Sequence, residues 1–199
     1  MVESAPGQLQ RVLEETIAAM ASMVEMKDPY TSGHQRRVAG LASAIAKEMG
    51  LDDSRLIAVR LAGAIHDLGK LAVPSEILNK PGTLTSLERK LIRIHPQAAY
   101  DILKGIDFPW PVAQIVLQHH ERLDGSGYPQ GLRGDDILLE SRIVTVADWV
   151  EATASHRPYR PAHGLQSTLT NLATRRGSSF DPAVVDTCLA LFHEGRIAL

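Results

Sequence analysis

The spacing of apolar residues restricts the fold of this 199-residue chain more than any other feature. Near the N-terminus these residues recur every three or four positions, which is the period of an amphipathic helix and not of a strand. The residues with this spacing are Leu9, Val12, Leu13, Ile17, Met20 and Val24. They predict a helix from about Gly7 to Lys27, which ends where Asp28, Pro29 and Gly33 interrupt the pattern.

The same period returns along the rest of the chain, between segments rich in Gly, Pro and Asp. Gly50 stops one predicted helix, and Asp52 or Asp53 caps the next. Thr85 to Glu88 form a capping box that opens another helix, and Asp181 caps the last one. Further helices are predicted at about residues 34–49, 53–67, 85–94, from 95 onward, 112–120, 137–155, 165–174 and 182–194. Residues 69–84 and 123–136 are predicted to be irregular. Because no pair of alternating segments with turn residues occurs, the sequence predicts an all-α fold class with a single helical domain.

Charge and cysteine content exclude several classes of protein. The chain carries 21 Lys and Arg and 23 Asp and Glu, a formal net charge of −2, which argues against binding of a nucleic acid polymer through a broad basic surface. The single Cys188 excludes an intramolecular disulfide and a cysteine-based zinc cluster. Neither a signal-peptide pattern nor a run of ~20 apolar residues is present. We therefore expect a cytoplasmic protein with no membrane span.

Histidine is unusually frequent, with eight residues against four Tyr, three Phe and two Trp. One of these histidines stands directly beside an acidic residue, in the pair His66-Asp67. Because neighbouring side chains on a helix project about 100° apart, this pair suits a dinuclear centre in which the carboxylate bridges two ions and the imidazole binds one. Lys70 follows on the same side of a helical turn, where its charge suits a phosphate oxygen. A capping aspartate beside a surface lysine would explain the pair alone, so the interpretation depends on further ligands.

Further candidate ligands lie at the ends of predicted helices. His34 and His95 begin helices, and His119-His120 ends one. Asp148 lies inside the apolar run Ile143–Val150, where an unpaired carboxylate would be costly and metal coordination would explain its presence. Five imidazoles and two carboxylates without a thiolate suit two divalent metal ions, with Fe or Mn favoured.

These residues belong to an ordered set of short segments. The segments are Asp28-Pro29-Tyr30-Thr31-Ser32-Gly33-His34, His66-Asp67-Leu68-Gly69-Lys70, Ile77-Leu78-Asn79-Lys80-Pro81-Gly82, His119-His120-Glu121, Asp124-Gly125-Ser126-Gly127-Tyr128-Pro129, Val146-Ala147-Asp148, Arg157-Pro158-Tyr159-Arg160 and Phe180-Asp181-Pro182. With this set, which includes the Gly-Tyr-Pro triplet, the chain resembles an HD-GYP domain from roughly Thr16 to Leu191. HD-GYP domains are a subfamily of the HD-type metal-dependent phosphohydrolases. The resemblance implies an N-terminal helical extension at residues 1–15 and the HD-GYP domain at residues 16–199.

The resemblance also implies an activity and a role for each site residue. The activity is hydrolysis of the bacterial second messenger cyclic di-GMP to linear pGpG and, in some members, GMP. The residues implied for one metal ion are His34, His66, Asp67 and Asp148, and those implied for the other are Asp67, His95, His119 and His120. The residues implied to touch substrate are Lys70 at the phosphate, Arg157 and Arg160 at phosphate oxygens, and Tyr128 in the bordering loop. In this interpretation Asp67 and Lys70 are catalytic, and the two ions lower the pKa of a shared water toward neutrality.

Several positions depart from the family pattern or extend it. Some members carry a Glu four residues before the first ligand His and hold a third metal, whereas this chain has Tyr30 there, so two ions are predicted. Glu151 stands where an Asp is usual, and its longer side chain predicts a rearranged contact beside the metal ligands. Glu121 and Asp124 are candidates for orienting the histidines.

Two other functions are compatible with the sequence. One is an HD phosphohydrolase that acts on another nucleotide or cyclic dinucleotide, and here the Gly-Tyr-Pro segment with Arg157 and Arg160 favours a cyclic dinucleotide. The other is a non-catalytic signalling adaptor, which the filled set of ligand positions argues against. The sequence leaves open the native metal, a signalling partner domain or protein, and the oligomeric state, a dimer included.

Overall fold

A computed structural model describes residues 5–28, 32–155 and 164–198. Within these residues the chain is helical and contains no strand, apart from an isolated bridge between Arg176 and Phe180. The α-helices are α1 (Ala5–Lys27), α2 (His34–Glu48), α3 (Asp53–Ile65), α4 (Ser75–Leu78), α5 (Ser86–Ile92), α6 (His95–Leu103), α7 (Val112–Gln118), α8 (Leu139–Ala154), α9 (Leu165–Thr174) and α10 (Pro182–His193), and the 3-10 helices are η2 (Leu68–Ala72) and η3 (Gly134–Asp136). The predicted all-α class is confirmed. No described helix combines the length and the apolar character needed to cross a membrane.

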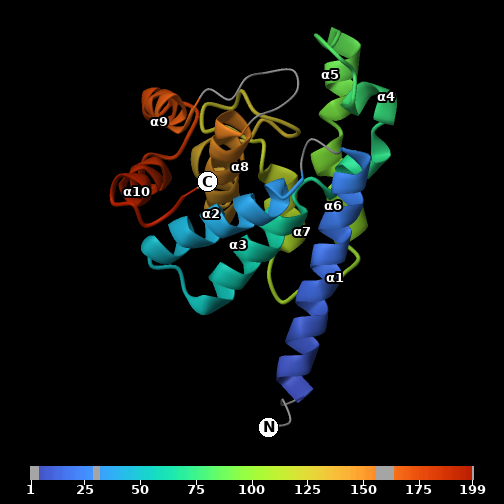
Figure 1. The fold of residues 1–199 in the computed structure, drawn as a ribbon, viewed down its shortest axis with the longest axis horizontal. Coiled ribbons are helices and arrows are strands. Elements are labelled where there is room, and N and C mark those ends of the chain that lie inside the picture. The colour runs from blue at the N-terminus through green and yellow to red at the C-terminus, as the bar shows by residue number, and fades with distance from the viewer. Residues whose placement is uncertain (1–4, 29–31, 156–163, 199) are drawn as a thin grey trace.

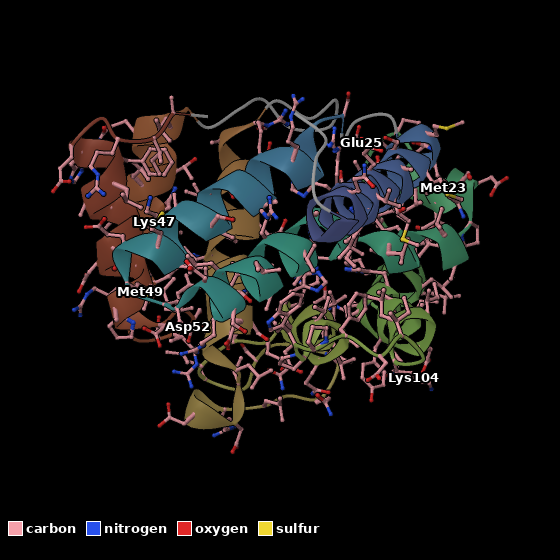
Figure 2. The ribbon with its side chains drawn as sticks, turned by 90° about the horizontal axis from the view of Figure 1, so that it is seen from below. Met23, Glu25, Lys47, Met49, Asp52 and Lys104 are labelled. Atoms are coloured by element: carbon pink, nitrogen blue, oxygen red, sulfur yellow. The ribbon has the colours of Figure 1, made fainter. Side chains whose placement is uncertain are left out.

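Helix α8 forms the centre of the hydrophobic core. Its residues Ile143, Val144, Val146, Ala147 and Val150 have no exposed surface. Helices α2 and α3 lie side by side across α8, and α7 packs against both α3 and α8 (Figures 1 and 2). Helices α9 and α10, orange and red in Figure 1, cover another side of α8. The ends of several helices therefore meet around one region of α8.

Helix α1 is confirmed close to its predicted bounds and is continuous across residues 15 and 16. Its buried residues Ile17 and Val24 face α3 and η2, whereas Val12 and Met23 are largely exposed. Figure 1 shows the N-terminal half of α1 extending away from the other helices. The division into a 1–15 extension and a 16–199 domain stays a prediction.

Two details around His66 differ from the sequence prediction. Helix α3 ends at Ile65, so His66 is its C-cap and Asp67 precedes the 3-10 helix η2. The predicted irregular segment 69–84 contains most of η2 and all of α4. The physical reason is tertiary: η2 packs against α6, and a Cβ at Gly69 would lie 1.9 Å from the carbonyl oxygen of His95. Apolar spacing carries no signal for such a contact.

The predicted helix caps are confirmed. Asp52, one of the two candidates, accepts a hydrogen bond from the backbone of Arg55. Thr85 and Glu88 form the reciprocal capping box at α5. The carboxylate of Asp181 accepts hydrogen bonds from the first turn of α10.

Candidate metal centre

Seven side chains predicted to bind metal converge in the structure, and each comes from an end or the middle of a helix. They are His34 at the start of α2, His66 at the end of α3, Asp67 before η2, His95 at the start of α6, His119 and His120 after α7, and Asp148 in α8. Their rings lie in an unbroken series, with centroid separations of 4.1–5.3 Å between neighbouring histidines. The fold therefore brings all seven predicted residues together.

The donor atoms form two separate groups, each compact enough to surround an ion, and a third group of His66, Asp67 and His119 that overlaps both. His34, His66 and Asp148 offer donor atoms within 4.8 Å of one another, and so do His95, His119 and His120. In the first group the Nε2 atom of His34 lies 3.2 Å from Oδ1 of Asp148. Two adjacent three-ligand sets are the arrangement expected of a dinuclear centre.

Asp67 lies between the two groups and faces each with a different oxygen. Its Oδ2 atom is 3.5 Å from Nε2 of His66 and 3.8 Å from Nε2 of His34. Its Oδ1 atom is 3.5 Å from Nε2 of His95. This geometry suits a carboxylate that bridges two ions.

Backbone carbonyls fix the orientation of three histidine rings. The Nδ1 atom of His66 lies 2.8 Å from the Gly63 carbonyl oxygen, and His95 and His119 make the same contact with the carbonyl three residues earlier, at 2.8 Å and 2.6 Å. Because Nδ1 donates to a carbonyl, Nε2 is the nitrogen left with a lone pair for a metal ion. The Nε2 atoms of His34 and His66 are buried and make no hydrogen bond of good geometry.

His34 is oriented by an acid in place of a carbonyl. Its Nδ1 atom contacts Oε2 of Glu151, a residue with 1% exposure. The other oxygen of Glu151 accepts hydrogen bonds from Nε of Arg37 and from the hydroxyl of Ser155, both at 2.7 Å. Glu151 thus contacts His34 directly with one oxygen and is held by Arg37 at the other.

The group of three histidines is electrically neutral near pH 7. Burial lowers the pKa of His95 to about 4 and the pKa of His119 to about 3. Burial also lowers the pKa of His120 well below its ordinary value. Neutral imidazole is the form that binds a metal ion.

The group around His34 carries concentrated negative charge. Burial opposes the ionisation of Asp67, but Lys70 and the neighbouring histidines hold the pKa of its carboxyl well below the ordinary value. Burial also opposes the ionisation of Asp148, and His34 and His66 hold the pKa of its carboxyl well below the ordinary value. Burial lowers the pKa of His34 too, yet the adjacent carboxylates of Asp148 and Glu151 outweigh it and raise that pKa to about 9. A positive charge is therefore strongly favoured at this position.

A cavity of about 340 Å³ lies directly beside the cluster. Asp67, His95 and Asp148 line it, together with the predicted substrate residues Lys70 and Tyr128. The Nζ atom of Lys70 is 2.7 Å from Oδ2 of Asp67. The described wall of the cavity ends at Ser155.

The Gly-Tyr-Pro segment is tied to the histidines and to Glu121. The Tyr128 ring lies 4.7 Å from the His120 ring, and its backbone N–H donates to the His120 carbonyl. The carboxylate of Glu121, 1% exposed, accepts hydrogen bonds from the backbones of Gln130 and Leu132 at 2.7 Å and 3.0 Å. Glu121 thus fixes the backbone of the loop that follows Tyr128. The described residues show no hydrogen bond from Glu121 to a histidine ring.

The remaining predicted residues are distributed as follows. Asp124 accepts a hydrogen bond from the backbone of Ser126 and belongs to the loop. Tyr30, Arg157 and Arg160 lie outside the described residues. The sequence-based prediction did not single out Arg122, which lines the cavity beside His120; its position directly after the His119-His120-Glu121 segment was the available signal.

A family model described as HD domain matches residues 18–184. The chain belongs to the HD domain family. The HD-type family predicted from the sequence is therefore confirmed.

Curated relatives of this HD domain are phosphodiesterases of cyclic dinucleotides. The cyclic di-GMP phosphodiesterase response regulator RpfG of Xanthomonas campestris is 41% identical over 177 residues, which are 88% of this chain and 47% of that protein. The 3'3'-cGAMP-specific phosphodiesterase 3 of Vibrio cholerae is 38% identical over 170 residues, 85% of this chain and 37% of that protein. This chain thus spans half or less of the length of these relatives.

Solved structures support the same fold. A cyclic GMP-AMP-specific phosphodiesterase of V. cholerae aligns with a TM-score of 0.72 and 19% identity over 92% of this chain and 49% of that chain. The HD domain of the L. monocytogenes phosphodiesterase PgpH, solved with cyclic-di-AMP, aligns with a TM-score of 0.62 and 23% identity over 91% of this chain and 98% of that chain.

Proposed function

We propose that this HD domain hydrolyses a phosphodiester bond of cyclic di-GMP at a centre of two divalent metal ions. The observation that carries the proposal is the pair of three-ligand groups with Asp67 between them, one carboxylate oxygen toward each. His34, His66 and Asp148 would hold one ion, and His95, His119 and His120 would hold the other. Asp67 would bridge them.

The residues present fit metal ions. The buried Nε2 atoms of His34 and His66 lack hydrogen-bond partners and point into a cluster of carboxylates. Imidazole and carboxylate donors without sulfur favour Fe or Mn over softer ions. When bound, such ions would activate water and neutralise charge on phosphoryl oxygens.

The side chains of the chain itself would bind and orient the substrate. Lys70 lines the cavity with its ammonium group beside Asp67, so a phosphate brought to the metal centre would also meet a cation. Tyr128 forms part of the wall of the cavity, held by its contacts with His120. Arg157 and Arg160, which lie outside the described residues, are proposed from their place in the family motif to hold further phosphate oxygens.

Relatives support cyclic di-GMP as the substrate, and one observation supports a second candidate. RpfG, a cyclic di-GMP phosphodiesterase by name, is 41% identical to this chain. However, a 3'3'-cGAMP-specific phosphodiesterase of V. cholerae, phosphodiesterase 1, is also 41% identical over 150 residues. Hydrolysis of 3'3'-cGAMP is therefore the second candidate. A cytoplasmic location is a further part of the proposal.

Product analysis on several substrates tests the proposal. The protein is purified without oxygen, its metal content is measured, and it is incubated with cyclic di-GMP, 3'3'-cGAMP or a linear mononucleotide. We expect pGpG from cyclic di-GMP with wild type and no product with Asp67→Asn. The matched control is Asp186→Asn, which alters an exposed aspartate paired with Arg176 and should leave turnover unchanged.

Each alternative function predicts a different result in this experiment. Cleavage of 3'3'-cGAMP alone would favour the second candidate, and cleavage of the mononucleotide alone would favour another HD phosphohydrolase activity. Tight binding of cyclic di-GMP by metal-loaded protein without any product would identify an adaptor.

A further inference from the structure

Arg122 is a partly buried cation without a partner in the wall of the cavity. Its Nη1 atom is buried and unbonded, and no ion pair or hydrogen bond of its guanidinium is found in the described part of the chain. Burial lowers the pKa of Arg122 from its ordinary value. Because removing a charged group from water is costly, buried arginines are normally paired with an anion. The lining of the cavity thus includes a cation whose Nη1 atom has no hydrogen-bond partner among the described residues.

Nearby acids do not serve as the partner of Arg122. The carboxylate of Glu121 is occupied by the backbones of Gln130 and Leu132. Asp148 acts on the charge of Arg122 through space but makes its close contacts with His34 and His66. Asp124 also acts through space, and its carboxylate accepts a hydrogen bond from the backbone of Ser126. The anion that would neutralise Arg122 must therefore come from outside the described residues.

Both the side chain and the backbone of Arg122 are held in place. The Cζ atom of its guanidinium lies 4.7 Å from the ring centroid of Phe180, which is almost fully buried. At the backbone, Gly127 packs so closely that a Cβ there would lie 2.4 Å from the nitrogen of Arg122. The next residue, Leu123, donates its N–H to the carbonyl of Ser179. An arginine fixed in this way loses little freedom when it binds an anion.

We infer that Arg122 is a substrate-binding residue whose guanidinium holds a phosphate oxygen of the cyclic dinucleotide, an inference that rests on the proposed function. Arg122 and Lys70 line the same cavity, so two cations of different chemistry face one anionic ligand. The planar fork of arginine can donate two parallel hydrogen bonds to a phosphate, which lysine cannot. In this inference the ring of Phe180, a residue of the Phe180-Asp181-Pro182 segment, supports the guanidinium of Arg122 by stacking against it.

Inhibition of a generic phosphodiesterase reaction tests this inference. Metal-loaded wild type, Arg122→Gln and Arg122→Lys hydrolyse the chromogenic diester bis(p-nitrophenyl) phosphate, and cyclic di-GMP, cyclic di-AMP and inorganic phosphate are the inhibitors. The matched control is Arg175→Gln. Arg175 stacks over Trp149 at 5.5 Å but is exposed and does not line the cavity.

We expect Arg122→Gln to raise the inhibition constants of both dinucleotides about 10- to 100-fold, the effect of losing a charged hydrogen bond. Arg122→Lys should recover part of this loss because it restores the charge but not the fork. Arg175→Gln should match wild type, and the metal content of all variants should be equal. Thermal melting confirms that each variant is folded.

Three results would overturn the inference. The first is a folded Arg122→Gln or Arg122→Lys protein that binds all inhibitors as the Arg175→Gln control does. The second is a loss confined to cyclic di-GMP, which would indicate contact with guanine in place of phosphate. The third is loss of metal together with loss of binding, which would make Arg122 a structural residue.

Failure of the proposed function gives a different pattern. If the domain does not bind cyclic dinucleotides at all, none of them inhibits wild type. Inhibition of diester hydrolysis by inorganic phosphate then tests the contact between Arg122 and phosphate. The contact is supported only if this inhibition is weaker in Arg122→Gln than in wild type and unchanged in Arg175→Gln.

Discussion

Single residues outside the ligand set control the geometry of the centre. His34 takes its orientation from Glu151, whose second oxygen is bound by Arg37. A carboxylate in this position fixes the ring and makes its free nitrogen a stronger donor. Glu151 is therefore expected to strengthen metal binding at the proposed first position.

Substitution of Glu151 tests its role in metal binding. Glu151→Gln keeps the shape of the side chain but removes its charge, so we expect metal affinity to fall about 10- to 100-fold. Competition titration with a fluorescent chelator measures this change.

Glu140→Gln is the matched control for this substitution. Glu140 lies on the same helix, is also buried, and pairs with Arg55 at 2.6 Å away from the cluster. Both variants are expected to lose some stability, but Glu140→Gln should keep wild-type metal affinity. Equal affinities in the two variants would contradict the proposed link from Glu151 to the metal.

Cys188 gives a second prediction for a single residue. It is fully buried in α10, and burial raises the pKa of its thiol to about 12. Because the thiolate is the reactive form, we expect no reaction with Ellman's reagent at pH 8 in the folded protein. One thiol per chain should react after addition of guanidinium chloride. Rapid stoichiometric labelling without denaturant would show that Cys188 is accessible.

At the level of secondary-structure elements, the contact between η2 and α6 brings the two halves of the centre together. Asp67 precedes η2 and His95 begins α6, so the distance between these elements sets the position of the bridging carboxylate. Gly69 makes the contact possible, since any side chain there would collide with the His95 backbone. The identity of this residue is thus imposed by packing between elements.

Gly69→Ala is expected to force η2 away from α6. The added methyl group has no space at the backbone of α6, and overpacking of this kind costs about 1–3 kcal/mol or more. We expect a lower urea midpoint and a lower metal content. Gly105→Ala, where the added Cβ meets no atom within 4 Å, is the control and should behave as wild type. A Gly69→Ala protein with full metal content would show that the two elements can separate without harm.

For the whole molecule, metal binding and folding are coupled. The candidate ligands extend from His34 to Asp148 and belong to helices that share one core around α8. Ions that bind this arrangement but not the unfolded chain stabilise the fold, by about 2.7 kcal/mol at a metal concentration of 100 times Kd.

Metal removal should therefore lower the melting temperature of wild type, as measured by calorimetry with and without a chelator. Asp67→Ala removes the proposed bridge, so its metal content should drop and its melting temperature should respond little to the chelator. An identical melting curve for loaded and stripped wild type would contradict the coupling.

Local patterns were sufficient to predict most helices and all seven candidate ligands. Apolar spacing and capping chemistry act over a few residues, so the bounds of α1, the capping box at Thr85 and the cap at Asp181 follow from neighbours in the chain. The seven positions lie in short segments whose residue types and order are both visible in the sequence. The HD-type family could therefore be identified from the residues alone.

Contacts between distant segments were decided only by the tertiary structure. The early end of α3, the short η2, the link from Glu151 to His34 and the isolated charge of Arg122 each depend on residues far away in the chain. No local pattern encodes which oxygen of Asp67 faces which histidine. The physical reason is that burial, shape and electrostatic potential are properties of the packed core, which exists only after the helices have assembled.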